Sequence, residues 1–114
     1  MRKTDKKLDN LITHVLTDVC ETTLKSFSGF QWLTHVVNYS SFPKSLSVIC
    51  VFDTNASLNE LIATDGHHEI TKVIQTRLFE VGIDIDRARI AFDSEEDCAK
   101  HHNGKWTNRL AKYS

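Results

Sequence analysis

Histidine and cysteine side chains gather at two places in the chain. Cys98, His101 and His102 lie within one short stretch, and His67 and His68 are adjacent. Thiolates and imidazoles are ligands of zinc and related transition metals. A structural zinc site needs four ligands in a defined geometry, and no other part of the chain shows matching spacing. We therefore expect exposed histidines near helix ends, with no metal and no other cofactor.

Two aspartates end apolar, β-branched runs. Asp53 follows Val51-Phe52 and precedes Thr54, and Asp93 follows Ala91-Phe92 and precedes Ser94. Paired carboxylates suit general acid–base catalysis. Asp, Ser and Thr also cap the first turn of helices, and we favour that role. The two strands need not point the same way, which would separate the carboxylates. With no recognisable nucleophile or glycine-rich phosphate loop, the protein is predicted not to be an enzyme.

Size and composition indicate one domain of an ordinary soluble type. The chain has 114 residues, of which 40% are hydrophobic and 25% charged, with a formal net charge of −1. Both ends are basic and can make local phosphate contacts, although solvated termini are the alternative interpretation. Three widely spaced cysteines and a polar start suggest a cytoplasmic protein with no membrane partner.

The first half of the chain predicts one helix and two strands. Apolar residues recur at steps of three and four from about Lys3 to Lys25, which indicates an amphipathic helix. Aromatic and β-branched residues then predict strands over Phe30–Tyr39 and Leu46–Phe52. The turn at Ser40–Lys44 makes these strands an antiparallel pair.

The second half predicts two joined helices and a third strand. Ser57 and Glu60 have the spacing of a capping box, so a helix is expected to begin there. The apolar positions change phase around Gly66, which predicts a turn or kink where glycine absorbs the change of backbone direction. The next helix ends at Gly82 with a left-handed cap. The third strand is expected over Ile85–Phe92.

The end of the chain is an extension of the core. Acids at positions 95–97 favour a helix start, and Asn103-Gly104 should end that helix. Trp106–Ser114 forms either a short helix or a tail on the sheet. The predicted fold is thus α+β, in the order α-β-β-α-α-β, with a three-stranded sheet, helices on one face and a C-terminal helical tail. Residues 1–114 form one domain, with a core over 1–93 and an extension over 94–114.

This order of elements resembles the type II KH fold, and the chain is most similar to the ribosome-binding factor A family. The resemblance covers roughly Lys3 to Asp93 and is carried by the first helix, the strand pair, the helix interrupted at Gly66 and the third strand. It implies a bacterial, ribosome-associated protein that binds RNA. The Gly-x-x-Gly loop of ordinary KH domains is absent here, where Gly66 stands in Asp65-Gly66-His67-His68-Glu69.

A shorter segment suggests a different partner. Asn108-Arg109-Leu110-Ala111-Lys112-Tyr113 is similar to the end of the recognition helix of Fis-type DNA-binding regulators. A helix-turn-helix needs two well-formed helices, and the short tail after Gly104 has room for one. A DNA-binding regulator is therefore the lesser alternative.

Aromatic side chains mark candidate contact surfaces. Trp32 shares a strand face with Phe30 by the two-residue period and is expected in the core. Phe42, in a turn beside Pro43, and Trp106, in a basic tail, are expected to be exposed.

The predicted function is binding of structured RNA or a ribonucleoprotein, such as a ribosomal subunit. The alternative is a protein-interaction or dimerisation module that uses a strand edge or the aromatic residues Phe42 and Trp106. The predicted nucleic-acid contacts are Gly66, His67, His68, Lys72, Arg77, Lys105, Trp106 and Arg109.

Overall fold

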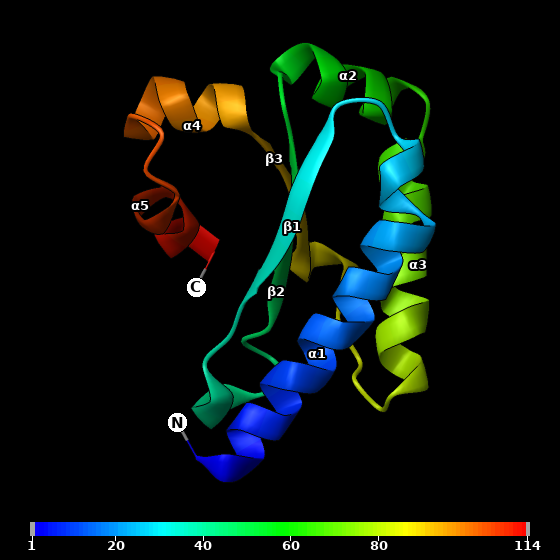
Figure 1. Cartoon of the computed structure of the whole chain (residues 1–114), viewed down its shortest axis with the longest axis vertical. Helices are drawn as coiled ribbons and strands as arrows, with labels where there is room; N and C mark the ends of the chain where they lie inside the picture. The colour runs from blue at the N-terminus through cyan, green and yellow to red at the C-terminus, as the bar shows by residue number, and fades with distance from the viewer. Residues whose placement is uncertain (1, 114) are drawn as a thin grey trace.

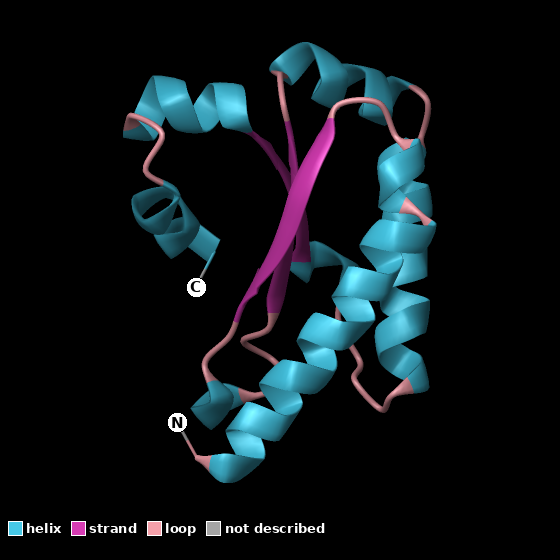
Figure 2. Ribbon diagram, in the orientation of Figure 1, coloured by secondary structure: helices cyan, strands magenta, loops and turns pink. Residues whose placement is uncertain are grey.

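The helices and strands follow one another in the predicted α+β order (Figures 1 and 2). The computed structural model describes residues 2–113, so Ser114 of the predicted tail lies outside the described residues. The main elements are α1 (Lys3–Thr22), β1 (Phe30–Val36), β2 (Ser47–Phe52), α2 (Asn55–Ala63), α3 (Gly66–Glu80), β3 (Ile90–Ser94), α4 (Glu95–His102) and α5 (Trp106–Leu110). Short 3-10 turns are η1 (Leu24–Ser26), η2 (Tyr39–Ser41), η3 (Arg87–Arg89) and η4 (Ala111–Tyr113).

The three strands form one mixed sheet in the order β1-β2-β3. β1 and β2 are antiparallel, as predicted, while β2 and β3 are parallel. Parallel neighbours need a crossover connection, and α2 and α3 provide it. Every residue of the central strand β2 is buried, which requires cover on both faces of the sheet.

The larger core lies between the sheet and the helices α1 and α3, which run side by side on one face (Figure 1). Alternate residues of β2 point into it, as the two-residue period of a strand requires. Its central side chains are Val48, Cys50 and Phe52 of β2, Ile12, Val15, Leu16 and Val19 of α1, and Ile70, Ile74 and Leu78 of α3. The helices α1 and α3 thus form the predicted layer on this face of the sheet.

The C-terminal helices lie on the other side of the sheet (Figure 1). The β2 residues that point to this side, Ile49 and Val51, are also fully buried. Ser47 of β2 donates a hydrogen bond to the carbonyl of Tyr113 at 3.1 Å, so the tail returns to the start of the strand. The tail combines the two predicted alternatives, because it forms a short helix and this helix packs on the sheet. None of the helices described is long and apolar enough to cross a membrane.

A β-bulge at Gln31 changes which face Trp32 occupies. Phe30 pairs with Phe52, but the register shifts so that Trp32 pairs with Val51. The ring of Phe30 packs against Phe52 in the larger core, at 5.8 Å between centroids. Trp32 points to the opposite face, because one extra residue reverses the alternation. The prediction that Trp32 shares a face with Phe30 is therefore wrong.

The start of α2 differs from the predicted capping box. Thr54 is extended and its Oγ1 accepts a hydrogen bond from the N–H of Ser57 at 3.1 Å. The helix consequently begins at Asn55, and Ser57 lies inside its first turn. Thr54 takes the capping role because it directly precedes the first helical residue, where an oxygen reaches the unpaired N–H groups.

The turn between α2 and α3 is where predicted, but its residues have exchanged roles. Asp65 carries the left-handed conformation, with φ 61°, while Gly66 begins α3. A Cβ atom on Gly66 would lie 2.6 Å from Cδ1 of Leu61 and 2.9 Å from the ring of Phe27. Glycine is needed at position 66 for space, and the predicted role in backbone direction belongs to Asp65.

The end of α3 is as predicted and the start of β3 is not. Gly82 is left-handed, with φ 84°, and the N–H of Ile83 bonds the carbonyl of Leu78 at 2.9 Å. The side chain of Asp86 accepts from the N–H of Ala88 at 2.9 Å and starts η3. Such local side-chain bonds compete with strand pairing, so β3 begins at Ile90, five residues later than predicted.

Candidate nucleic-acid interface

The candidate interface lies where α3 runs beside β3 and the loop before it. The ring of His67 meets that of Phe92 of β3 at 6.2 Å between centroids. Eight residues further along the chain, Nε2 of Gln75 donates to the carbonyl of Ile85 at 3.0 Å. We call this region the α3–β3 surface: the side of α3 that bears His68, Lys72 and Gln75, together with Lys44 and residues 84–89.

The α3 side of this surface is a polar stripe. His68, Lys72 and Gln75 are separated by steps of four and three residues, so they lie above one another on one helix face. His68 and Lys72 are exposed. The stripe leads from the turn before α3 to the loop before β3.

The loop side of this surface forms an open hollow of about 580 Å³. Three cations line it, Lys44, Arg87 and Arg89, together with Gln75 of α3 and the carboxylates of Asp84 and Asp86. Lys44 reaches the hollow from the turn between β1 and β2, next to Pro43. Residues from three separate parts of the chain thus line the hollow, and two of these parts supply the charges.

Local hydrogen bonds hold the loop side in place. Asp86 caps η3, and the N–H of Arg89 bonds its carbonyl at 2.9 Å. The Nε atom of Arg89 donates to the carbonyl of Leu46 at 3.3 Å, so this guanidinium is anchored and half-buried. Arg87 and Lys44 remain exposed. The surface can therefore offer two exposed cations beside an anchored one to an anionic partner.

The structure brings together some of the residues predicted on α3. His67 faces β3, where its ring meets that of Phe92, while His68 and Lys72 lie on the exposed side of the helix. Gly66 is buried beside Leu61 and Phe27 and offers no side chain to the surface. Arg77 is on the opposite side, where it forms ion pairs with Asp18 of α1 and Glu80.

Lys105, Trp106 and Arg109 lie on the other face of the sheet, away from the α3–β3 surface. Arg109 is buried, with 6% of its side chain exposed. Its Nε and Nη2 atoms donate to the two carboxylate oxygens of Asp93 at 2.8 and 2.7 Å. Tyr113 donates a further bond to Asp93 at 2.7 Å. Arg109 thus attaches the tail to the sheet and is not part of the α3–β3 surface.

Burial and hydrogen bonding act in opposite directions on the Asp93 carboxyl. Burial by itself raises the pKa, because it disfavours the charged form. Bonds from Arg109, Tyr113 and the N–H of Ser94 outweigh burial and hold the pKa of Asp93 below its usual 3.8. Asp93 is therefore ionised at neutral pH and pairs with a permanently charged guanidinium.

This lowered pKa predicts a loss of stability in acid. A carboxyl group whose pKa is depressed by folding stabilises the protein above its unfolded value and loses this effect as the pH falls. We expect the free energy of unfolding to decrease as the pH drops below about 4, as measured by urea denaturation. Asp93→Asn should show a shallower decrease, because the variant lacks this carboxyl group. Part of the decrease should remain, since the pKa values of Asp9 and Asp53 are also lowered. An equal slope in both proteins would contradict this assignment.

Trp106 also packs and hydrogen-bonds within the molecule. Its ring packs on Trp32 at 4.8 Å between centroids, in an edge-to-face arrangement. The two indole N–H groups donate to the two oxygens of Glu95, at 2.5 Å from Trp32 and 3.1 Å from Trp106. Phe42, the other predicted contact residue, is half-buried beside Tyr39, at 6.0 Å between ring centroids.

The two aspartates considered for acid–base chemistry lie at the same end of the sheet. Asp53 directly follows β2, Asp93 is the last residue but one of β3, and the two strands are parallel. The interpretation that the strand directions separate the two carboxylates is wrong, because β2 and β3 run parallel. Each has its own partners: Asp53 accepts from the N–H of Thr54 at 2.7 Å, and Asp93 binds Arg109.

Sequence reasoning missed the loop side of the interface. Arg87 and Arg89 fell inside the strand predicted over Ile85–Phe92, where an alternating pattern would place both on one strand face. The Asp86 side chain was the available signal for a turn at this point, since aspartate commonly bonds the N–H two residues further on. The approach of Lys44 to this loop depends on tertiary structure.

Known proteins do not add to this description: no family model, curated protein or solved structure matches the chain.

Proposed function

We propose that the protein binds structured RNA or a ribonucleoprotein through the α3–β3 surface and has no catalytic activity. The observation that carries this proposal is the hollow lined by Lys44, Arg87 and Arg89, which continues into the stripe of Lys72 and His68. The order of helices and strands is the one on which the resemblance to KH-like proteins rests. By that resemblance, the RNA is ribosomal and the protein is cytoplasmic and bacterial.

The chemistry of the surface suits the sugar–phosphate backbone. Phosphate oxygens are bound by Lys and Arg side chains, and this part of binding is independent of sequence. Four cations, Lys44, Lys72, Arg87 and Arg89, stand against the two carboxylates Asp84 and Asp86. Such a surface makes at most a few phosphate contacts. We therefore expect moderate affinity and a salt dependence with a log–log slope no steeper than about −3.

Removing the two exposed cations of the hollow tests the proposal. In Lys44→Gln/Arg87→Gln, we expect affinity for bulk ribosomal RNA to fall at least tenfold, because two phosphate contacts are lost. The salt slope should decrease in magnitude by about 2, or one for each contact. Fluorescence anisotropy with labelled RNA at several salt concentrations measures both quantities.

A charge-matched variant on the other face provides the control. Lys100 and Lys105 are exposed and lie in or beside α4. Lys100→Gln/Lys105→Gln removes the same charge and should leave the affinity within about twofold, since it removes no contact at the α3–β3 surface. Equal losses in the two variants would mean that binding follows net charge alone, and the proposed surface would be abandoned.

A protein partner is the second candidate, and exposed apolar side chains favour it. Phe79 of α3 has 69% of its surface exposed, and Val81 has 38%. An apolar contact at this end of α3 would respond little to salt. Complexes isolated from lysate that survive both nuclease and high salt would support this function over RNA binding.

A further inference from the structure

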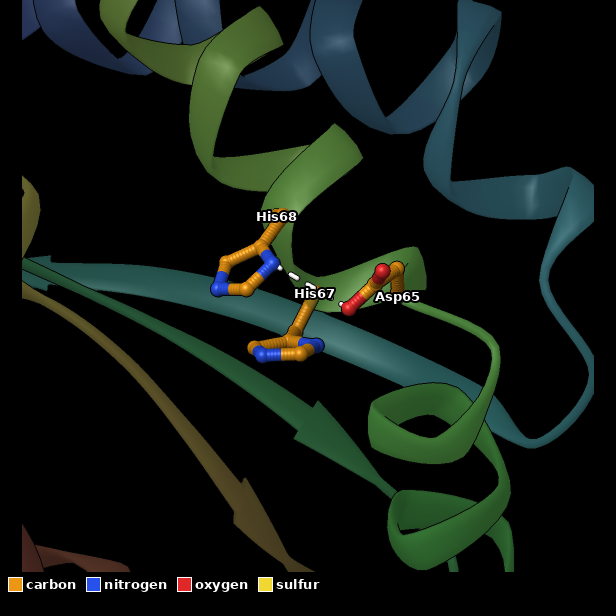
Figure 3. Close-up of side chains that lie close together, drawn as sticks. All are labelled: Asp65, His67 and His68. Atoms are coloured by element: carbon orange, nitrogen blue, oxygen red, sulfur yellow. Dashed lines mark ion pairs between the residues drawn. The ribbon is translucent and has the colours of Figure 1, made fainter.

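We propose that Asp65, His67 and His68 form a binding site for a zinc ion at the turn between α2 and α3 (Figure 3). Each residue offers one ligand atom, and these atoms all lie within 4.8 Å of one another. Two imidazoles and a carboxylate are ligands that Zn²⁺ accepts. The site shares His68 with the α3–β3 surface but contains none of the cations of the loop side, and its chemistry does not depend on the proposed function.

The backbone of the turn brings the three side chains together. Asp65 is left-handed and directly precedes α3, whose first turn contains both histidines. Oδ1 of Asp65 lies 3.2 Å from Nδ1 of His68, the ion pair drawn in Figure 3. The ring of His67 lies against that of His68, with centroids 3.9 Å apart. On its other side, His67 contacts Phe92 of β3, so this ligand is positioned by the sheet.

An unsatisfied nitrogen is the second observation. Nδ1 of His67 is buried, and it has no hydrogen-bond partner among residues 2–113. The large majority of buried side-chain polar atoms in proteins are hydrogen-bonded, so an exception needs an explanation. A bound cation explains it, since a neutral imidazole nitrogen donates its lone pair to a metal.

The geometry needs a small adjustment to close around the ion. Donors around tetrahedral zinc lie about 3.3–3.6 Å apart, given metal–ligand distances of roughly 2.0–2.2 Å. The side chains of Asp65 and His68 are 79% and 73% exposed, so they can rotate inward without disturbing the core. His67 stays against Phe92 as the fixed ligand. Three protein ligands leave the fourth position to water, as in open zinc sites.

The electrostatic balance permits a cation at this place. A helix N-terminus carries the equivalent of roughly half a positive charge, which opposes a metal ion there. Asp65 contributes a full negative charge at the same point and more than offsets it. The first turn of α3 also contains Glu69. The ion pair between Asp65 and His68 would be replaced by stronger bonds from both residues to the metal.

Calorimetric titration of the full chain with Zn²⁺ alone tests the site. We expect one ion per chain and, with Co²⁺ in its place, the visible absorption of a tetrahedral complex. His67→Phe keeps a ring against Phe92 but removes the donor, and Asp65→Asn keeps a residue that tolerates the left-handed conformation. Each variant should bind Zn²⁺ at least tenfold more weakly while retaining the circular dichroism of the parent.

The double variant His101→Ala/His102→Ala serves as the matched control, because it removes the other adjacent histidine pair. It should keep the stoichiometry and affinity of the parent. The proposal is overturned if the parent binds no equivalent of Zn²⁺, if His67→Phe or Asp65→Asn binds as tightly as the parent, or if the control variant loses binding. Since no RNA is present, these outcomes are independent of the test of RNA binding.

Discussion

Replacing Arg109 by methionine is expected to lower the free energy of unfolding by about 3–5 kcal/mol, because it leaves Asp93 buried without its partner. The Asp93 side chain is 4% exposed and accepts both bonds of the bidentate pair. Removing one member of such a pair forfeits the attraction, while the cost of taking the remaining charge out of water persists. Tyr113 and the N–H of Ser94 are neutral donors that balance no charge. Lys112 is a cation, but its Nζ lies 3.9 Å from the carboxylate and its side chain is 49% exposed, so it replaces the guanidinium only weakly.

The location of the pair makes the effect larger than its two residues suggest. Asp93 belongs to β3 and Arg109 to α5, and the pair joins the C-terminal helices to the sheet (Figure 1). Ile49 and Val51 of β2 are fully buried on this side of the sheet. If the tail detaches, their apolar surface meets water, at a cost of roughly 25 cal/mol for each Å² exposed.

A double-mutant cycle measures the pair directly. Asp93→Asn/Arg109→Met removes both charges. It should lose less stability than the two single variants lose in sum, because the double variant leaves no isolated buried charge. Urea denaturation followed by circular dichroism gives the four free energies. Lys105→Met, an exposed cation close in sequence, is the control and should change stability by less than about 0.5 kcal/mol. Strict additivity, or an equal loss in the control, would show that the pair does not hold the tail.

Gly29→Ala is expected to destabilise the fold by about 2–5 kcal/mol, for two separate reasons. Gly29 has φ 85°, a conformation that costs an L-residue about 1–2 kcal/mol. A Cβ atom at this position would also lie 2.5 Å from Oγ of Ser57 and 2.6 Å from Oδ1 of Asp53. Relieving such an overlap typically costs a further 1–3 kcal/mol.

The close approach at Gly29 joins two parts of the fold. Its carbonyl accepts a hydrogen bond from the N–H of Asp53 at 2.8 Å, which extends the pairing of β1 and β2. Asp53 in turn bonds the N–H of Thr54, the residue that caps α2. Moving the backbone at position 29 to make room would therefore disturb the start of α2 as well as the edge of the sheet.

Gly104 offers a control that separates the two costs. It also has a positive φ, 75°, but a Cβ atom there would meet nothing within 4 Å. Gly104→Ala should therefore lose only the conformational term of about 1–2 kcal/mol. Thermal and urea denaturation of both variants compare the two positions. If they lose equal stability, the overlap with Ser57 and Asp53 carries no energy, and our explanation for Gly29 is wrong.

Features governed by neighbouring residues were predictable from the sequence. The amphipathic stripe of α1, the left-handed cap at Gly82 and the helix stop at Asn103-Gly104 are all present. Each depends on contacts within a few positions along the chain, where side-chain periodicity and backbone preference act directly. The order of elements followed from these signals.

Features that depend on distant contacts were decided by the tertiary structure. The bulge at Gln31 moved Trp32 to the opposite face, and the parallel pairing of β2 and β3 put Asp53 and Asp93 at one end of the sheet. Arg109 looked like a free cation in a basic tail and proved to be the partner of Asp93, sixteen positions away.

The physical reason is that a charge or an aromatic ring has the same sequence signature whether it meets solvent or a buried partner. Local preferences determined which segments of this protein form helices and which form strands, because these preferences depend on residues close in sequence. The packing of segments against one another then decided which cations pair with carboxylates of the same chain, as Arg77 and Arg109 do, and which remain exposed on the surface, as Lys44 and Arg87 do.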